Sequence, residues 1–215
     1  LVSILPGMAQ TEKLTDYVNP FVGTDGYGNV YPGAQIPFGG IQISPDTDSR
    51  FYDAASGYKY NHLTLMGFSL THLSGTGIPD LGDFLFIPGT GEMKLEPGTH
   101  EDPDQGYRSR YSHDKEWASP NYYAVELADY GVKAEMTSGV RSGMFRFTYP
   151  ESDNAFIMID MNHTLWQSCE WSNLRMINDS TITGYKLVKG WGPERHVYFT
   201  ATFSKKLTGL RFVQD

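Results

Sequence analysis

The stretch NYYAVELADYGVKAEMT, residues 121–137, decides the fold class of this chain. Apolar and polar side chains alternate from Tyr122 to Leu127 and again from Val132 to Thr137. A period of two is typical of a half-buried strand, and Asp129-Tyr130-Gly131 supplies turn residues between the two runs. The stretch therefore predicts an antiparallel β-hairpin.

Similar short runs lie on both sides of this hairpin. They cover residues 38–44, 84–87 (stopped by Pro88-Gly89), 141–149, 156–160 and 196–203. In the last run Val197, Phe199, Ala201 and Phe203 are predicted to face inward, with His196, Tyr198, Thr200 and Thr202 outward. No helical period recurs, and 23 Gly and 12 Pro break the chain often. We predict an all-β fold, a large antiparallel β-sandwich.

Length and composition limit how many domains the chain can form and which classes of partner it can bind. The chain has 215 residues, which suits one β-sandwich domain over residues 10–215. Lys and Arg number 17 against 25 Asp and Glu, a net charge of −8, and no basic run is present. Nucleic acid and anionic membranes are therefore poor partners, and no apolar run is long enough for a membrane span. The single cysteine, Cys169, excludes an internal disulfide and is interpreted as an inert buried residue.

The first nine residues are treated separately. Leu1 to Ala9 is apolar and ends in Gly7-Met8-Ala9, a small-x-small pattern typical of a signal-peptide cleavage site. A disordered tail is the alternative. The signal interpretation predicts export, and the end of the chain at Asp215 suggests that the sandwich continues beyond it.

Standard catalytic motifs are absent. Gly75 to Asp80 begins like a dinucleotide fingerprint but lacks its third glycine and contains Pro79. Asp46-Thr47-Asp48 begins like a calcium loop, but Arg50 and Tyr52 stand where a ligand and a glycine are needed, so we interpret it as an Asx-type turn.

Polar and aromatic residues instead crowd among glycines in four segments. These are residues 24–29, 52–58, 71–77 and 190–195, three of them in the loop-rich stretch from Tyr17 to Gly82. Glycines let a backbone approach a ligand, aromatic faces cover the C–H faces of sugars, and polar groups bond their hydroxyls. Taken alone, each segment is explained more simply as a turn, because Gly and Asp also dominate turns.

Many short motifs in order resemble the start of glycoside hydrolase family 92. They are Tyr17–Thr24, Tyr31–Ala34, Pro37–Gly39, Ser44–Thr47, Ser56–Tyr58, Gly67–Ser69, His72–Gly77, Gly82-Asp83, Tyr111–His113, Ala118–Pro120, Tyr122-Tyr123 and His196–Phe199. The resemblance runs from Tyr17 to Leu207.

This resemblance implies a bacterial, calcium-dependent exo-α-mannosidase that inverts the anomeric centre. Of the possible linkages, we expect α-1,2 to be the one cleaved. Members of the family have an N-terminal supersandwich-like β-domain packed on a C-terminal (α/α)6 toroid. The toroid carries the acid and base carboxylates, and the resemblance implies the same arrangement for the parent of this chain. This chain would be the N-terminal domain, exported to the periplasm or cell surface, with mannose-containing glycans and the toroid as partners. No catalytic residue or metal ligand is assigned here.

The family's motifs place six substrate-binding candidates in this sequence. The family's Trp-Asp pair, which helps to form the terminal-mannose subsite, corresponds to Tyr52-Asp53 here. The family's Ser-His-Thr-His run reads Ser69-Leu70-Thr71-His72, so only the second of its two histidines is kept. A Gly-Trp turn is kept as Gly190-Trp191. The candidates are Tyr52, Asp53, His72, Thr76, Trp191 and Asp25, expected to gather at one end of the sandwich.

Two classes of function stay open. The first is the N-terminal domain of an α-mannosidase, and the second is a carbohydrate-binding or structural sandwich without catalysis. For the chain alone we expect no hydrolysis of α-mannosides, because inversion needs two carboxyl groups about 6.5–9.5 Å apart. Calcium binding by the chain alone is expected to be weak or absent, because no loop offers a full set of oxygens.

Overall fold

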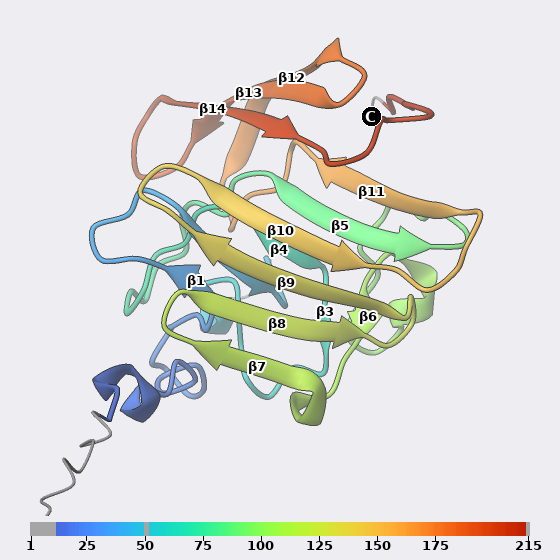
Figure 1. Ribbon diagram of the computed structural model, residues 1–215. Coiled ribbons are helices and arrows are strands. Elements are labelled where there is room, and N and C mark those ends of the chain that lie inside the picture. Colours follow the sequence, from blue (N-terminus) through green and yellow to red (C-terminus); the bar gives the residue numbers. More distant parts are fainter. Residues whose placement is uncertain (1–11, 50–51, 214–215) are drawn as a thin grey trace, which may run out of the picture.

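A computed structural model describes residues 12–49 and 52–213, and these residues form almost only strands (Figure 1). The strands are β1 Ala34–Gln35, β2 Gln42–Asp46, β3 Thr64–Leu65, β4 Gly67–Ser69, β5 Leu85–Thr90, β6 Ser109–Arg110, β7 Glu116–Ser119, β8 Tyr122–Leu127, β9 Val132–Ser138, β10 Gly143–Thr148, β11 Ala155–Asp160, β12 Ser168–Asn178, β13 Thr181–Lys189 and β14 Arg195–Thr202. The helical elements among them are single 3₁₀ turns: η1 Leu14–Tyr17, η2 Tyr52–Ala54, η3 Pro103–Gln105 and η4 His113–Lys115. The predicted signal segment, residues 1–9, lies outside the described residues.

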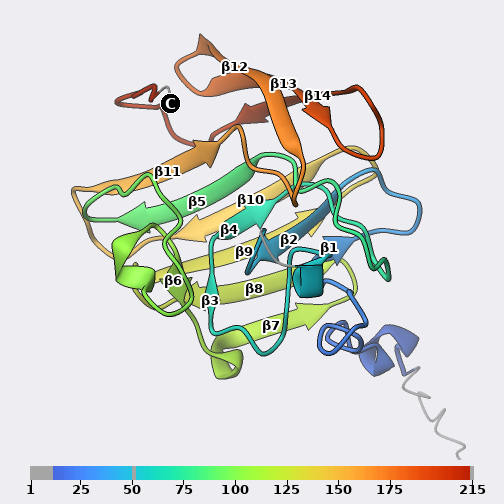
Figure 2. The ribbon, with the colours of Figure 1, turned by 180° about the vertical axis from the view of Figure 1, so that it is seen from behind.

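Two antiparallel sheets make the body of the sandwich. One has the strand order β1-β2-β4-β5-β11 and the other the order β10-β9-β8-β7. Figure 2 shows the first sheet in front of the second. The predicted all-β antiparallel sandwich is confirmed.

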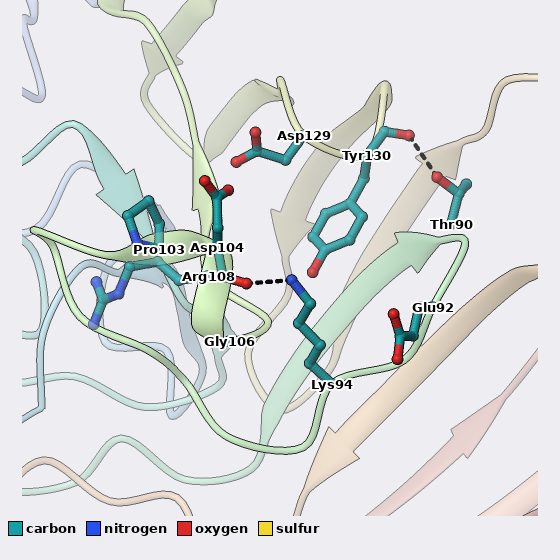
Figure 3. A pocket seen from close by; sticks show the side chains of 9 residues that line it. All are labelled: Thr90, Glu92, Lys94, Pro103, Asp104, Gly106, Arg108, Asp129 and Tyr130. Carbon is teal, nitrogen blue, oxygen red and sulfur yellow. Dashed lines mark hydrogen bonds between the residues drawn. The ribbon is translucent and has the colours of Figure 1, made fainter.

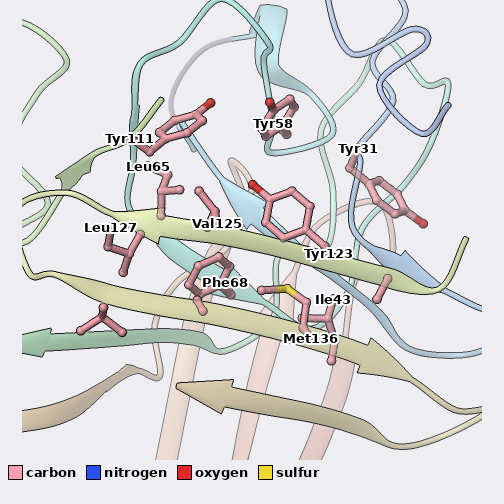
Figure 4. Packing of buried hydrophobic residues seen from close by; sticks show 13 residues of the cluster. Tyr31, Ile43, Tyr58, Leu65, Phe68, Tyr111, Tyr123, Val125, Leu127 and Met136 are labelled. Carbon is pink, nitrogen blue, oxygen red and sulfur yellow. The ribbon is translucent and has the colours of Figure 1, made fainter. Parts of the chain in front are cut away.

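The main core fills the space between these sheets (Figure 4). Ile43 on β2 and Phe68 on β4 meet Tyr123 on β8 and Met136 on β9, and all four side chains are buried. Each residue points inward because alternate residues of a strand face opposite sides of the sheet. Burying such side chains is the main favourable term in folding a domain of this size.

The hairpin at residues 121–137 forms as predicted. Tyr123 pairs with Met136 and Leu127 with Val132 in antiparallel register. Gly131 has φ +63°, the left-handed conformation that a tight turn requires and that glycine adopts without strain. Local sequence therefore determines this part of the fold.

Two predicted strand boundaries are wrong. The strand predicted from residue 38 begins at Gln42, because Phe38 sits at φ +60° in a turn closed by Gly39 N–H donating to the Ile36 carbonyl. The run that was predicted to stop at Pro88 continues to Thr90. Gly89 pairs with Phe156 on β11, and its lack of a side chain makes room for the Phe156 ring, which a Cβ would approach to 2.5 Å.

A third sheet, β12-β13-β14, lies beside the edge strand β11. Its last strand alternates as predicted: Val197, Phe199 and Ala201 are partly covered, and the residues between them are exposed. Phe199 joins this sheet to the body, since its ring lies 4.6 Å from Phe84 and 5.9 Å from Phe86 between centroids. Phe203, predicted as the last inward residue, follows the strand.

The loops of the molecule gather at two opposite ends. In Figure 1 the connections β1–β2, β4–β5 and β13–β14 lie at the left, and the β8–β9 turn and η3 lie at the right. We call the first the loop end and the second the turn end. No helix in the described ranges is long and apolar enough to cross a membrane.

Candidate functional site

Backbone contacts join the glycine-rich segments at the loop end. Gly75 N–H donates to the Asn29 carbonyl at 2.8 Å, which ties the segment 71–77 to the segment 24–29. Gln167 Nε2 donates to the Pro79 carbonyl at 2.8 Å, and Leu165 N–H donates to the Leu81 carbonyl at 3.0 Å. These contacts bring a further segment, residues 163–167, to the same place.

Several exposed aromatic side chains lie at this end, Tyr27 and Phe38 among them. We call three of them, Tyr52, Trp166 and Trp191, the aromatic rim. Their exposed fractions are 55%, 62% and 62%. The rings of Tyr52 and Trp166 lie 6.0 Å apart between centroids and meet at 85°. Large aromatic side chains favour burial, so a group of them left in solvent at one end is a candidate binding surface.

The backbone beneath the rim adopts strained conformations. Leu81, Phe84 and Trp166 have φ +73°, +58° and +72°. A bulky residue in the left-handed region costs about 1–3 kcal/mol, and such residues cluster at functional sites. Gly82, at φ +74°, also needs its missing side chain, because a Cβ would meet the Leu165 side chain at 2.6 Å.

Asp80 anchors the turn that carries Trp191. Its carboxylate is almost fully buried and accepts the backbone N–H groups of Trp191 at 3.1 Å and of Leu81 at 2.6 Å. A Cβ on Gly190 would come within 3.0 Å of the same carboxylate. The Gly-Trp pair is therefore explained: glycine lets the turn approach Asp80, and Trp191 is carried outward.

Behind Asp80, Asp83 is the centre of a buried ion-pair cluster. Arg195 Nη1 donates to Asp83 Oδ2 at 2.5 Å, and Lys186 Nζ lies 3.1 Å from Asp83 Oδ1. The Lys186 and Asp83 side chains are essentially inaccessible to solvent. Burial alone would raise the pKa of Asp83, but the charge of Lys186 and the hydrogen bond from Arg195 outweigh it and lower that pKa. The carboxylate therefore stays ionised and joins β13 and β14 to the 79–84 segment.

A second buried carboxylate lies between two histidines. His72 Nε2 is 2.8 Å from Asp46 Oδ1, and His163 Nε2 is 2.8 Å from Asp46 Oδ2. Burial opposes ionisation of Asp46, but the charge of His72 and the hydrogen bond from His163 dominate and lower its pKa. The sequence interpretation of Asp46 as a turn residue is wrong, because it ends the strand β2 and its side chain is sealed inside.

His72 occupies the floor of the site. Its side chain is fully buried, its Nδ1 lies 2.7 Å from the Gln42 carbonyl and its Nε2 also lies 3.0 Å from Ser69 Oγ. Both ring nitrogens lie within hydrogen-bond distance of protein oxygens, so neither is free to reach a ligand. The expectation that His72 bonds a sugar hydroxyl directly does not fit this geometry, and in this structure it is a positioning residue.

The remaining candidates lie in exposed turns. Thr76 Oγ1 accepts the Ile78 N–H at 3.3 Å, and Asp25 Oδ1 accepts the Gly26 N–H at 2.8 Å, as turn residues do. Their segments meet through the contact between Gly75 and Asn29, but neither side chain has a described contact with the aromatic rim. Asp53 lies in η2 next to Tyr52, and its side chain is outside the described part of the chain.

The turn end holds a polar pocket of about 310 Å³ (Figure 3). Arg110, close to this pocket, donates to Asp104 at 2.9 Å through both Nη1 and Nη2 and to Asp129 at 2.8 Å. Lys94 Nζ donates to the Asp104 carbonyl. These charged groups are paired with one another, and the one aromatic side chain that lines the pocket, Tyr130, is partly buried and donates its hydroxyl to the Tyr107 carbonyl at 2.9 Å. The loop end is therefore the better candidate site.

Comparison with known proteins identifies the family. Residues 17–215 match the glycosyl hydrolase family 92 N-terminal domain. The chain belongs to glycoside hydrolase family 92.

Solved structures and a curated protein agree with this assignment. The structure of the family 92 glycosyl hydrolase ccman5 is 29% identical, with a TM-score of 0.71 over 86% of this chain and 26% of that one. An inverting mannosidase of the family from Bacteroides thetaiotaomicron is 25% identical, with a TM-score of 0.63 over 81% of this chain and 23% of that one. An uncharacterized secreted glycosidase from Arthroderma benhamiae is 30% identical over 139 residues, which are 64% of this chain.

The family 92 domain spans only part of these relatives, from 17% to 26% of their length. Its own carboxylates do not fit a calcium site. Asp46 is held between His72 and His163, and Asp83 is paired with Lys186 and Arg195. In the described ranges no group of three or more His, Cys, Asp or Glu side chains is arranged to hold a metal ion. Calcium takes about six to eight oxygens, so we assign it no ligand in this domain. Weak or absent calcium binding by the chain alone stays a prediction.

Sequence reasoning assigned no role to several residues that the structure brings to the candidate site. Trp166 lies outside the four glycine-rich segments, and Asp80 and Arg195 lie within or beside them without having been assigned a role. The partners Asp46 and His163 are 117 residues apart, so no local pattern could have paired them. One usable signal existed for Trp166: it is a large aromatic in a short polar stretch, Asn162 to Ser168, where no strand is predicted.

Proposed function

We propose that this domain belongs to an exported, calcium-dependent exo-α-mannosidase that inverts the anomeric centre, with α-1,2-linked mannose as the first expected substrate. The observation that carries the proposal is the match of residues 17–215 to the N-terminal domain of the family. An inverting mannosidase among the similar structures supports the reaction, and a secreted glycosidase among the relatives supports export. We place it in the bacterial periplasm or at the cell surface.

The proposed role of the domain is to hold one sugar, while the reaction is carried by carboxylates elsewhere in the parent enzyme. The aromatic rim would cover the C–H faces of the sugar. Asp80 holds the Trp191 turn, and the Asp46 and Asp83 clusters keep the segments beneath the rim in place. Asp46, Asp80 and Asp83 are all engaged by protein groups, so none of them is free to protonate a leaving oxygen or activate water.

A calcium ion would supply the grip on sugar hydroxyls, with ligands from the C-terminal toroid and none from the described residues of this chain. The toroid is the proposed partner that completes the active site against the loop end. Val22, Phe38 and Val140 are exposed at 72%, 102% and 59%, which suits a surface that another domain covers.

The test is expression of the gene product that includes the sequence following Asp215. The longer protein is expected to release mannose from α-1,2-mannobiose, with β-mannose as the first anomer seen by proton NMR, and to lose activity in a chelator. The isolated chain is expected to show no turnover. Retention of the α-anomer, or turnover by the isolated chain, would contradict the proposal.

A second candidate is a carbohydrate-binding or structural sandwich without catalysis. The pairing of every buried carboxylate at the loop end favours it for the chain alone. A downstream sequence without paired acidic residues on a helical domain would favour it for the parent protein as well.

A further inference from the structure

We propose that Trp166 is a specificity-determining residue of the sugar site: with Tyr52 it forms a two-sided aromatic corner that receives one pyranose ring. This inference rests on the proposed function, because it concerns the same site. It adds a residue to which neither motif nor resemblance assigns a role.

The backbone turns the Trp166 side chain toward solvent, and this requires an unfavourable conformation. Leu165, the residue before it, is 1% exposed, whereas Trp166 is 62% exposed. The left-handed backbone of Trp166 is strained for so large a side chain. An exposed indole on a strained backbone contributes little to the core, so folding alone does not explain it.

Hydrogen bonds fix the turn that carries the indole. Thr164 Oγ1 donates to the Gln167 carbonyl at 2.8 Å, and Gln167 Nε2 donates to the Pro79 carbonyl at 2.8 Å. Leu165 N–H is bonded to the Leu81 carbonyl. Since the turn is tied on three sides, the indole is presented in a preorganised position, which lowers the entropy lost on binding.

The geometry of the two rings suits a sugar. The Tyr52 and Trp166 rings stand at 85° to each other, and both are more than half exposed, so together they form two walls of a corner. A pyranose can place its C–H face on one wall and an edge on the other. A sugar whose hydroxyls point at a wall would lose these contacts and leave polar groups desolvated. The corner therefore selects between sugars that differ in hydroxyl orientation.

The arrangement extends toward Trp191. A Cβ on Gly190 would lie 2.7 Å from Gln167 Cγ, so the turn that carries Trp191 packs directly on the turn that carries Trp166. The turn that carries the third residue of the aromatic rim is therefore a direct neighbour of the corner.

The test labels the four tryptophans of the chain, Trp117, Trp166, Trp171 and Trp191, with 5-fluorotryptophan and titrates it with methyl α-mannoside. Trp-to-Phe variants assign the four fluorine resonances. The Trp166 resonance is expected to shift saturably, and those of Trp117 and Trp171 are expected to stay fixed. Trp171 is the matched control, because it is 53% exposed but lies on β12 against Tyr185.

Variants sharpen the result. Trp166→Ala is expected to weaken methyl α-mannoside binding by about three- to tenfold and to reduce the preference over methyl α-glucoside. Trp166→Phe should retain most of that preference, and Trp171→Ala should change neither. Unchanged urea midpoints for these variants separate a lost contact from a lost fold.

The outcomes distinguish this inference from the proposed function. A sugar-dependent shift at Trp191 with none at Trp166 would overturn the role of Trp166 and leave the proposed function standing. No shift at any tryptophan up to saturating sugar would overturn the aromatic corner, while α-mannoside hydrolysis by the longer protein would be judged separately.

Discussion

The two ends of this sandwich use the same charged residue types with opposite results. At the loop end Asp46 and Asp83 are buried and held by histidine, lysine or arginine. At the turn end Asp104 and Asp129 meet Arg110 in solvent, with 44% of the arginine side chain exposed. Buried pairs are costly to break because the remaining charge is left without water, whereas exposed pairs are screened. The loop end is therefore rigid for reasons that the turn end lacks.

The largest expected effect is at Asp46. Asp46→Asn removes the charge between His72 and His163 and leaves their protons without a carboxylate. Breaking a buried pair in this way is expected to lower the free energy of unfolding by about 3–5 kcal/mol. Urea denaturation at neutral pH measures it. Asp104→Asn is the matched control and should leave stability unchanged; equal losses in both variants would remove the distinction between the ends.

Gly57→Ala should have the next largest effect. A Cβ on Gly57 would come within 2.1 Å of Asp46 Oδ1, and the residue has φ +85°. We expect a loss of about 2–3 kcal/mol from the clash and the strain together. Gly75→Ala, at φ +72° with open space around it, should cost about 1 kcal/mol from backbone strain alone. If the two substitutions cost the same, Asp46 is not held as tightly as described.

The loop end should also differ from the turn end in how its contribution to stability depends on acid. The pKa values of Asp46 and Asp83 are lowered in the folded state, so their contribution is present at neutral pH. It is lost as the pH falls below about 4, where these groups become protonated in the unfolded chain. Between pH 6 and pH 3 the free energy of unfolding should fall by about 2 kcal/mol, because the contribution of these two carboxylates is lost. Urea midpoints across this range should show a shallower acid slope in Asp46→Asn, and an unchanged slope would contradict the assignment.

The smallest expected effect is at Arg110. Its pKa is raised by hydrogen bonds to Asp104 and Asp129, so the guanidinium is charged at any ordinary pH and the pairs form wherever the two carboxylates are ionised. Because the group is exposed, Arg110→Ala should leave the thermal midpoint almost unchanged, and any difference from the unmodified chain should vanish in high salt. A difference that persists in high salt would show that the turn end is stabilised in the same way as the loop end.

The same contrast explains what could be predicted from the sequence. The hairpin at residues 121–137 and the alternation in β14 are local patterns, and both are confirmed. The strand boundary near Phe38 depends on a left-handed conformation that is unusual for phenylalanine, and the boundary near Pro88 depends on pairing with a strand that contains Phe156, far away in the chain. Tyr52 and Trp191 were predicted as site residues because they lie among glycines that mark turns, and the structure leaves both exposed. Trp166 was not found, because its position depends on contacts with Pro79 and Leu81 far away in the chain.

The most direct measurement of the central claim is a ¹H–¹⁵N NMR titration of this chain with methyl α-mannoside. The account predicts saturable shifts confined to the loop end, in residues 24–29, 52–58, 71–83, 163–167 and 190–195. Resonances of the turn end, residues 90–110 and 126–131, should not move. Shifts that gather at the turn end, or that follow no single surface, would contradict the placement of the sugar site.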